Sequence, residues 1–348
     1  MSVAPPAPQT TVNENSAIHY SGQYWNDLPQ VVAYMSEDFT GDPAKWWVSD
    51  FQERFCSKPL GTGLVVNCGN GWVERELVDR GVVTAVAAFD YSWDLLCAAA
   101  RECGSRAIHY VRADANTVSF APDSFDVVFN VAALHHVQYL DRLCRVLCEA
   151  LKPSGVFVNF DYVGPHRNQY SRRHRRRTTR VNRPLRAAVR KQPLRRAHLP
   201  TMPSTDPSEA IHSELILATV ARYFDIFERH DTGGGIAYEL LTHNPSLHTL
   251  GPEAADPYVR EVLIWGRHYT AHGQVQPLFS YFLAHPRKDV PRDTARLRFF
   301  QDEEDRREAR ALSRGGVYSF AGVLTMLRHR LLLRLRRTRL GQRLWRWR

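Results

Sequence analysis

An apolar run that breaks into a glycine turn and then into a helical segment most constrains how this chain folds. Residues 64–73 read LVVNCGNGWV, and the charged segment ERELVDR follows directly. This pattern predicts a buried strand, a tight turn through Gly69 and Gly71, and a helix. Backbone N–H groups in such a turn can approach a nucleotide-like cofactor closely, so the turn is a candidate cofactor site.

Further strands and helices alternate along the chain after this turn. A second apolar strand over residues 82–89 ends in Asp90, and an acid at this point of a βαβ unit accepts hydrogen bonds from ribose hydroxyls. The next expected elements are a helix over residues 93–103, a short strand over 108–111 that leads to Asp114, a strand over 124–130, a helix that ends at Ala150 and a strand over 156–160. The alternation predicts an α/β protein with a doubly wound sheet.

At these residues the chain resembles the class I S-adenosylmethionine-dependent methyltransferases. Residues 67–71 resemble the glycine loop of that family, Asp90 its ribose-binding acid, and Asp114 the side chain beside the adenine amino group. SFDVV at residues 124–128 and LKPSG at residues 151–155 are similar to its signatures at the fourth strand and before the fifth.

The resemblance implies a Rossmann-like, seven-stranded doubly wound sheet that binds S-adenosylmethionine. Its last two, antiparallel strands are expected near residues 223–229 and 278–285. The residues expected to contact the cofactor are Asn67, Cys68, Gly69, Asn70, Gly71, Asp90, Tyr91, Asp114, Ala115, Asn130 and, from an aromatic N-terminal stretch, Tyr24.

Two more segments are similar to a bacterial subgroup associated with glycan and natural-product assembly. They are YVGP at residues 162–165 and DPSEA at residues 206–210. This similarity implies methyl transfer to a hydroxyl of a sugar, a glycolipid or a secondary metabolite, with a small molecule or glycan as the acceptor.

The glycine loop departs from the family pattern at two positions. The family usually has an acid where this chain has Val65 and a glycine where it has Asn67. Asparagine tolerates a left-handed backbone well, so the turn can still form. The two departures keep open one alternative, a methyltransferase-like binding protein without turnover. A second alternative, a scaffold docked on a membrane, is kept open by the basic C-terminal tail described below.

Three side chains that could move a proton follow neighbouring strands. His135 and His136 come after the fourth strand, and Asp161 ends the fifth. Because the carboxyl ends of parallel strands meet at one edge of a sheet, these side chains should converge. A histidine beside a carboxylate is a general base near neutral pH, so His135 or His136 with Asp161 is the predicted catalytic base. The alternative is that one histidine only caps a helix or bonds within its loop.

Two other enzyme classes fit the sequence less well. A dinucleotide dehydrogenase would need a third loop glycine, but Glu74 follows Gly69 and Gly71 in that register. A nucleic-acid base methyltransferase would suit the net charge of +10, but NVAA at residues 130–133 lacks the prolines and the aromatic of that class. Nucleic acid is therefore an unlikely partner.

The basic residues cluster in two blocks. The first, residues 171–196, is expected to be a helical insert over the rim of the active site, where it could attract an anionic acceptor. In the second, residues 315–348, Leu327, Leu331, Leu335 and Leu340 lie close to one helical face among arginines. That pattern is typical of a helix on an anionic membrane surface; the alternative is a helix docked on its own domain or on a second subunit.

The domain organisation follows from these features. We expect a disordered tail over residues 1–18, a helical cover over 19–60, the methyltransferase domain over 61–290 with an insert near 166–205, and a basic amphipathic extension over 291–348. The opening residues lack the pattern of a signal peptide, which predicts a cytosolic protein, and residues 315–348 offer it a way to associate with a membrane. The six cysteines form no metal-ligand motif, so no metal site is predicted.

Overall fold

A seven-stranded sheet forms the centre of the molecule. The computed structural model describes residues 24–191, 199, 202, 206–290 and 293–337. The strand order is β3-β2-β1-β4-β5-β7-β6, and β7 runs antiparallel to both of its neighbours. The strands are β1 (Leu60–Val66), β2 (Val83–Asp90), β3 (Ile108–Arg112), β4 (Phe125–Val131), β5 (Leu151–Tyr162), β6 (Phe224–Thr232) and β7 (Phe279–Pro286). The predicted fold class and the antiparallel pairing of the last two strands are confirmed.

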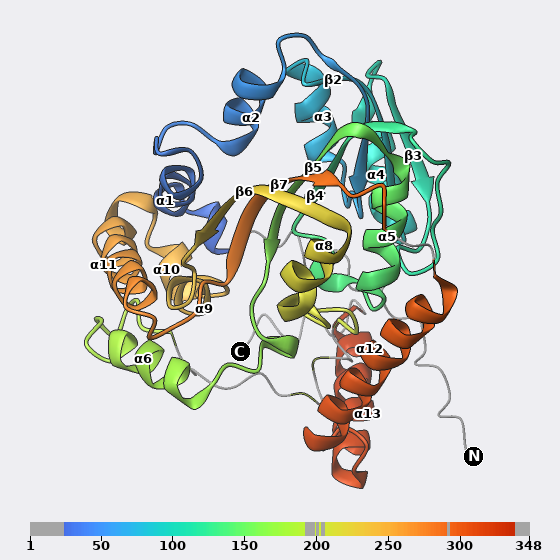
Figure 1. The fold of residues 1–348 in the computed structure, drawn as a ribbon. Coiled ribbons are helices and arrows are strands. Elements are labelled where there is room, and N and C mark those ends of the chain that lie inside the picture. The colour runs from blue at the N-terminus through green and yellow to red at the C-terminus, as the bar shows by residue number, and fades with distance from the viewer. Residues whose placement is uncertain (1–23, 192–198, 200–201, 203–205, 291–292, 338–348) are drawn as a thin grey trace.

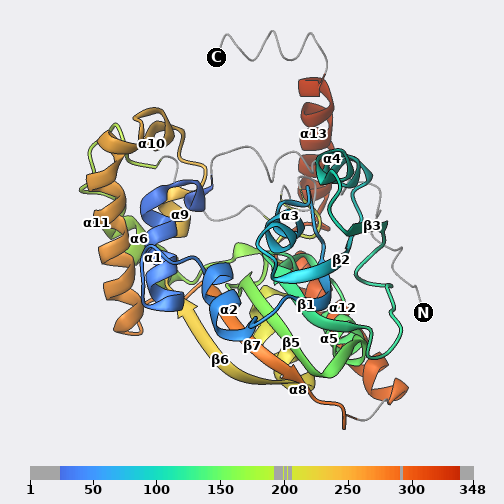
Figure 2. The same ribbon diagram turned by 90° about the horizontal axis from the view of Figure 1, so that it is seen from above.

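Both faces of the sheet are covered by helices (Figures 1 and 2). Successive side chains of a strand point to opposite faces, so β1 sends Val65 to one hydrophobic cluster and Leu64 and Val66 to the other. The first cluster includes side chains of α2 (Trp47–Phe55), α3 (Trp72–Asp79) and α4 (Trp93–Cys103). The second includes those of α5 (Leu140–Ala150) and α8 (Ile216–Tyr223). Burial on both faces explains why the central strands are almost continuously apolar.

A group of helices lies beside the β6 edge of the sheet (Figures 1 and 2). Its members are η3 (Trp25–Asp27), α1 (Pro29–Thr40), α6 (Arg172–Asn182), α9 (Ala237–Leu241), α10 (Pro245–Thr249) and α11 (Pro252–Ala271). The segment α9–α11 is inserted between β6 and β7 and was not predicted from the sequence. Pro257 and Gly266 lie inside α11, and both residue types usually indicate the end of a helix.

Two helices follow the last strand. α12 (Thr294–Arg314) packs against α5, and α13 (Phe320–Arg337) extends away from the body of the molecule in both views (Figures 1 and 2). Within the described part of the chain, no helix has both the length and the hydrophobicity needed to cross a bilayer. The predicted N-terminal tail, residues 1–18, and the end of the chain, including Leu340, lie outside the described residues.

Candidate functional site

A cavity of about 730 Å³ lies at the carboxyl ends of the central strands. Its walls come from the loops that follow β1, β2, β3 and β4, from the end of β5, and from η3, α9 and the segment around Glu209. The predicted site residues that line it are Tyr24, Asn67, Cys68, Gly69, Asn70, Asp90, Tyr91, Asp114, Ala115, His135 and His136. Such a volume is in the range of small-molecule and cofactor sites.

The glycine loop after β1 has the left-handed backbone that the sequence pattern requires. The φ angles are 46° at Asn67, 57° at Gly69 and 77° at Gly71. Gly71 does not line the cavity; it precedes α3, and a Cβ atom there would lie 2.8 Å from the Cβ of Ala99. The absence of a side chain at Gly71 therefore lets the turn pack against α4. Its predicted contact with the cofactor stays a prediction.

Asp90 at the end of β2 ties the glycine loop to the next strand. Its Oδ2 accepts a hydrogen bond from the Gly69 N–H at 2.9 Å, and its Oδ1 accepts one from the Ser92 N–H at 2.7 Å. Asp90 itself lines the cavity. Because a carboxylate oxygen can accept more than one hydrogen bond, Asp90 can hold the loop and also accept from ribose hydroxyls.

Asn130 and Asp161 lie beneath the cavity wall. The Asn130 Nδ2 donates to Asp161 Oδ2 at 2.7 Å, and both side chains are fully buried. Neither residue lines the cavity. The Asn130 amide is turned toward the buried carboxylate, which it helps to position. The predicted contact between Asn130 and the cofactor stays a prediction.

His135 is held by Asp161. The His135 Nδ1 lies 2.6 Å from Asp161 Oδ1. The other carboxylate oxygen accepts hydrogen bonds from the backbone N–H groups of Ala133, at 3.2 Å, and Leu134, at 2.7 Å. These bonds form because Ala132, with a φ of 53°, turns the chain sharply between β4 and η4 (Leu134–His136). Positive φ is costly for alanine, and such strain is often found at functional sites.

His135 and Asp161 each shift the pKa of the other. Burial disfavours the charged form of His135, but the negative charges of Asp161, Glu209 and Asp206 outweigh burial and raise its pKa to about 9. Burial also works against ionisation of Asp161, yet the charge of His135 and the hydrogen bonds from His135 and Asn130 hold its pKa below the usual range. The assignment of His135 as the base stays a prediction.

His136 faces a segment that the sequence analysis noted only as a subgroup signature. The His136 Nδ1 lies 3.1 Å from the Ser208 Oγ. Asp206 Oδ1 accepts from the Ser208 hydroxyl at 2.7 Å and from the Glu209 N–H at 3.1 Å, which fixes the turn. Ser208 and Glu209 both line the cavity. Glu209 was not predicted as a site residue, although the DPSEA motif gave a signal that could have identified it.

Aromatic side chains form another part of the cavity wall. Trp25, Tyr162, Tyr238 and Phe279 line it, and the Trp25 and Phe279 rings stack with centroids 5.0 Å apart. Trp25 comes from η3 and Tyr238 from α9, so the helical group beside the sheet completes the cavity. The position of Tyr238 in the cavity wall could not be predicted from the sequence, because the helix that carries it, α9, was not predicted.

The charge of the cavity is one-sided. Asp27, Asp90, Asp114 and Glu209 line it, and no lysine or arginine is found among the described lining residues. A pyrophosphate would therefore meet carboxylates without a compensating cation from these residues. A positively charged ligand would be stabilised by them.

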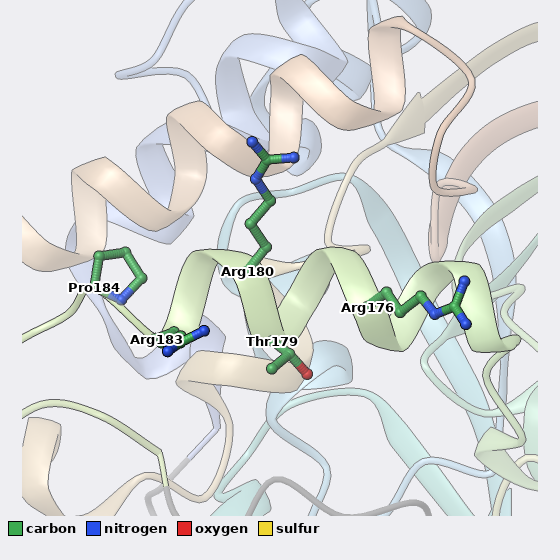
Figure 3. A pocket seen from close by; sticks show the side chains of 5 residues that line it. All are labelled: Arg176, Thr179, Arg180, Arg183 and Pro184. Carbon is green, nitrogen blue, oxygen red and sulfur yellow. The ribbon is translucent and has the colours of Figure 1, made fainter.

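The arginine-rich insert lies elsewhere. No described residue of α6 lines the cavity; instead, Thr178 Oγ1 donates to Glu239 Oε2 at 2.8 Å and Arg177 stacks over the Tyr269 ring, which packs α6 against α9 and α11. The expected position of the whole block, residues 171–196, over the active-site rim stays a prediction, because residues 192–196 lie outside the described part of the chain. A separate hollow of about 540 Å³ is lined by Arg176, Thr179, Arg180, Arg183 and Pro184. Its three arginine side chains point in different directions (Figure 3), so they do not converge on one small anion.

Comparisons with known proteins agree with this geometry. Residues 64–159 match the family model described as a methyltransferase domain. The chain contains a class I, S-adenosylmethionine-dependent methyltransferase domain. The matched residues cover the end of β1, all of β2, β3 and β4, most of β5 and every predicted cofactor contact except Tyr24.

Several relatives of the methyltransferase domain are known. An uncharacterized chloroplastic methyltransferase of Arabidopsis thaliana is 28% identical over 142 residues, which is 38% of this chain and 39% of that protein. A malonyl-[acyl-carrier protein] O-methyltransferase of Enterobacter lignolyticus is 33% identical over 105 residues, which is 30% of this chain and 40% of that protein. The chain thus spans about two-fifths of the length of these relatives.

Solved structures also resemble the chain. A methyltransferase from Mesorhizobium loti is 22% identical, with a TM-score of 0.41 over 66% of this chain and 91% of that one. A phosphoethanolamine N-methyltransferase of Haemonchus contortus, solved with S-adenosyl-L-methionine, is 17% identical, with a TM-score of 0.47 over 81% of this chain and 62% of that one.

Proposed function

We propose that this chain transfers a methyl group from S-adenosylmethionine to a hydroxyl of a sugar, a glycolipid or a secondary metabolite. The observation that carries the proposal is the acidic, cation-free lining of the cavity, with Asp90 where the ribose of the cofactor would lie. A sulfonium cation suits such a lining, whereas a dinucleotide does not. Val65 does not prevent this, because Asp90 orders the loop through the Gly69 N–H.

The chemistry requires alignment and removal of one proton. S-adenosylmethionine supplies the methyl carbon; its C–S bond breaks as the acceptor oxygen forms a new C–O bond, and S-adenosylhomocysteine leaves. The protein aligns the three atoms, which contributes much of the rate, and removes the hydroxyl proton. We assign that proton to the site formed by His135 and His136, with Asp161 as the positioning carboxylate.

The aromatic wall supports an acceptor with an extended apolar face. Tyr162, Tyr238 and Phe279 lie within stacking range of one another, with ring centroids 5.2 to 5.7 Å apart. Such rings pack against the apolar face of a sugar ring or of a polycyclic metabolite. The described lining offers no cation for a phosphate, so the acceptor would reach the cavity with an uncharged part.

Cofactor binding is the first test. Calorimetric titration of the full chain with S-adenosylmethionine and with S-adenosylhomocysteine should show micromolar binding. Asp90→Asn should weaken it by about 10- to 100-fold, because hydrogen bonds to a charged group contribute about 1.5–3 kcal/mol. Asp94→Asn is the matched control, since Asp94 is exposed on α4 outside the cavity. Absence of binding at millimolar ligand would overturn the proposal and favour a silent binding protein or a scaffold.

Turnover tests the three residues that we assign to proton removal. Release of S-adenosylhomocysteine, measured with a panel of hydroxylated acceptors, should fall by about 100-fold or more in His135→Ala, His136→Ala and Asp161→Asn. Affinity for the cofactor should stay within about twofold in all three. Unchanged turnover in these variants would reject the assignment of the proton to this site.

We also propose that α13 docks on an anionic membrane surface, which would bring a lipid-linked acceptor close. Phe320, Leu324, Leu327 and Leu331 follow helical spacing on one face of α13, and all four are exposed. Residues 315–348 contain arginines and no acidic residue. An exposed apolar face next to positive charge is complementary to an anionic bilayer. The cytosolic location also stays a prediction.

A further inference from the structure

We propose that His135, His136 and Glu209 bind a divalent transition-metal cation at the acceptor end of the cavity. This inference rests on the methyl transfer proposed above, and it revises the role of the two histidines from proton acceptors to metal ligands. It also differs from the sequence prediction that no metal is bound. The ligand atoms would be the Nε2 atoms of both histidines and a carboxylate oxygen of Glu209.

The distances between these atoms fit a shared ion better than direct hydrogen bonds. Glu209 Oε2 lies 4.0 Å from the His135 Nε2 and 3.9 Å from the His136 Nε2. Both distances are too long for hydrogen bonds. The three residues each present a ligand atom, and these atoms all lie within 4.8 Å of one another. Bonds of about 2.0–2.2 Å to one ion place tetrahedral ligand atoms about 3.4 Å apart, so small side-chain rotations would complete the site.

The two imidazole rings are already oriented for coordination through Nε2. The Nδ1 of His135 is engaged by Asp161 Oδ1 at 2.6 Å, and the Nδ1 of His136 lies 3.1 Å from the Ser208 Oγ. A carboxylate or hydroxyl partner on the second ring nitrogen is the usual arrangement around metal-bound histidine, where it fixes the tautomer and the ring orientation.

The backbone holds the two ligand-bearing segments together. The Ile211 N–H donates to the His135 carbonyl at 3.1 Å, directly linking the segment after Glu209 to η4. Arg167, buried to 2% exposure, donates to the carbonyl oxygens of Pro207 at 2.7 Å and of Glu209 at 3.0 Å. These tertiary contacts therefore fix the positions of the backbone segments that carry the three proposed ligands.

The ligand types select the class of metal. Two imidazoles and one carboxylate suit Zn²⁺, Co²⁺, Mn²⁺ or Fe²⁺, whereas Mg²⁺ and Ca²⁺ prefer oxygen ligands. Three protein ligands leave positions open, and all three residues line the cavity. An acceptor hydroxyl in an open position would be oriented, and its pKa would fall. Its proton passes to water, its oxygen attacks the methyl carbon as the C–S bond breaks, and the histidines act as ligands instead of accepting the proton directly.

Cobalt binding to the full chain tests the inference. The protein is treated with a chelator, dialysed and titrated with Co²⁺, while visible absorption and equilibrium dialysis report the coordination and the stoichiometry. We expect one equivalent to bind with an absorption typical of nitrogen and oxygen ligands. Glu209→Gln and His136→Gln should each weaken binding by about 10-fold or more.

A matched histidine variant separates this site from chance binding. His268 and His272 lie one turn apart on α11, with ring centroids 4.3 Å apart, and could bind Co²⁺ on the surface. His272→Gln should therefore leave the affinity of the cavity site and its absorption unchanged. Loss of the signal in His272→Gln, no binding by the unmodified chain, or equal binding by Glu209→Gln and His136→Gln would each overturn the inference.

Cofactor titration of the same samples keeps the two proposals distinguishable. Glu209 lies at the acceptor end, so Glu209→Gln should bind S-adenosylhomocysteine with unchanged affinity in the presence of chelator. Normal cofactor binding with no Co²⁺ binding would reject the metal site alone. Failure of both titrations would reject the proposed function as well.

Discussion

Two fully buried carboxyl groups near the cavity are pushed in opposite directions by their surroundings. Asp161 accepts hydrogen bonds from side-chain and backbone donors and lies beside His135, so it stays ionised. Glu74, on α3 beside the Cys68 thiol, has no such set of donors, and burial raises its pKa to about 7. The sequence alone could not separate these acids, because their difference depends on neighbours far along the chain.

Glu74 should make the stability of the protein depend on pH. Burial raises the pKa of Glu74 from its ordinary value of 4.5 to about 7 in the folded protein. The free-energy cost of ionising the buried carboxyl group is therefore absent below about pH 4.5 and complete above about pH 7. Glu74→Gln removes that dependence. Relative to the unmodified chain, the variant should gain up to about 3 kcal/mol in unfolding free energy between about pH 5 and about pH 8.

Urea denaturation at the two pH values measures this difference. Glu76→Gln on the same helix is the matched control, because Glu76 is only half-buried and pairs with Arg80. A gain that is equal at both pH values, or that also appears in Glu76→Gln, would contradict the assignment.

At the scale of elements, α12 supports the segment that carries Ser208 and Glu209. Glu308 of α12 is buried, with Oε1 2.6 Å from the Arg167 Nη2 and Oε2 2.9 Å from the His166 Nε2. Arg167 in turn holds two carbonyl groups of the segment around Glu209. A helix predicted as part of a basic extension therefore also positions one wall of the cavity.

Removing Glu308 should loosen that wall. Glu308→Gln leaves the buried Arg167 guanidinium without its carboxylate, and breaking a buried ion pair costs about 3–5 kcal/mol. We expect a loss of about 3 kcal/mol in chemical denaturation and a weaker affinity for Co²⁺, with cofactor affinity unchanged. Glu303→Gln, on the exposed face of the same helix, should change stability by less than about 0.5 kcal/mol. Equal effects of the two substitutions would show that Glu308 does not support the site.

At the scale of the whole molecule, opposite charges are kept apart. The net charge is +10, yet the described cavity lining contains acids and no lysine or arginine. Many arginines lie in α6 and in residues 315–348, and no described residue of either segment lines the cavity. The cavity can therefore attract a cationic cofactor while the outer surface attracts anions.

Flotation with lipid vesicles tests whether α13 docks on an anionic membrane. The full chain should float with vesicles that contain an anionic phospholipid, float weakly with purely zwitterionic vesicles, and be released by high salt. Replacing Leu327 and Leu331 together by Asp should abolish flotation, because it places charge on the apolar face of α13. The matched control is Asp302→Asn, on the exposed surface of α12, which should float as the unmodified chain does. Equal flotation of the double variant would reject membrane docking through α13.

The sequence by itself determined the sheet, because the order of apolar strands, glycine turn and strand-end acids depends on local pattern. Asn67 and Gly69 have the left-handed backbone that the glycine turn requires, and both line the cavity with Asp90. Only the tertiary structure decided which side chains face the cavity. In the fold, the Asn130 amide faces Asp161, and the described arginines of α6 lie outside the cavity lining. Glu209 and Tyr238 line the cavity although they are far from the glycine loop in the sequence. These contacts join residues distant in the chain, and no local periodicity encodes them.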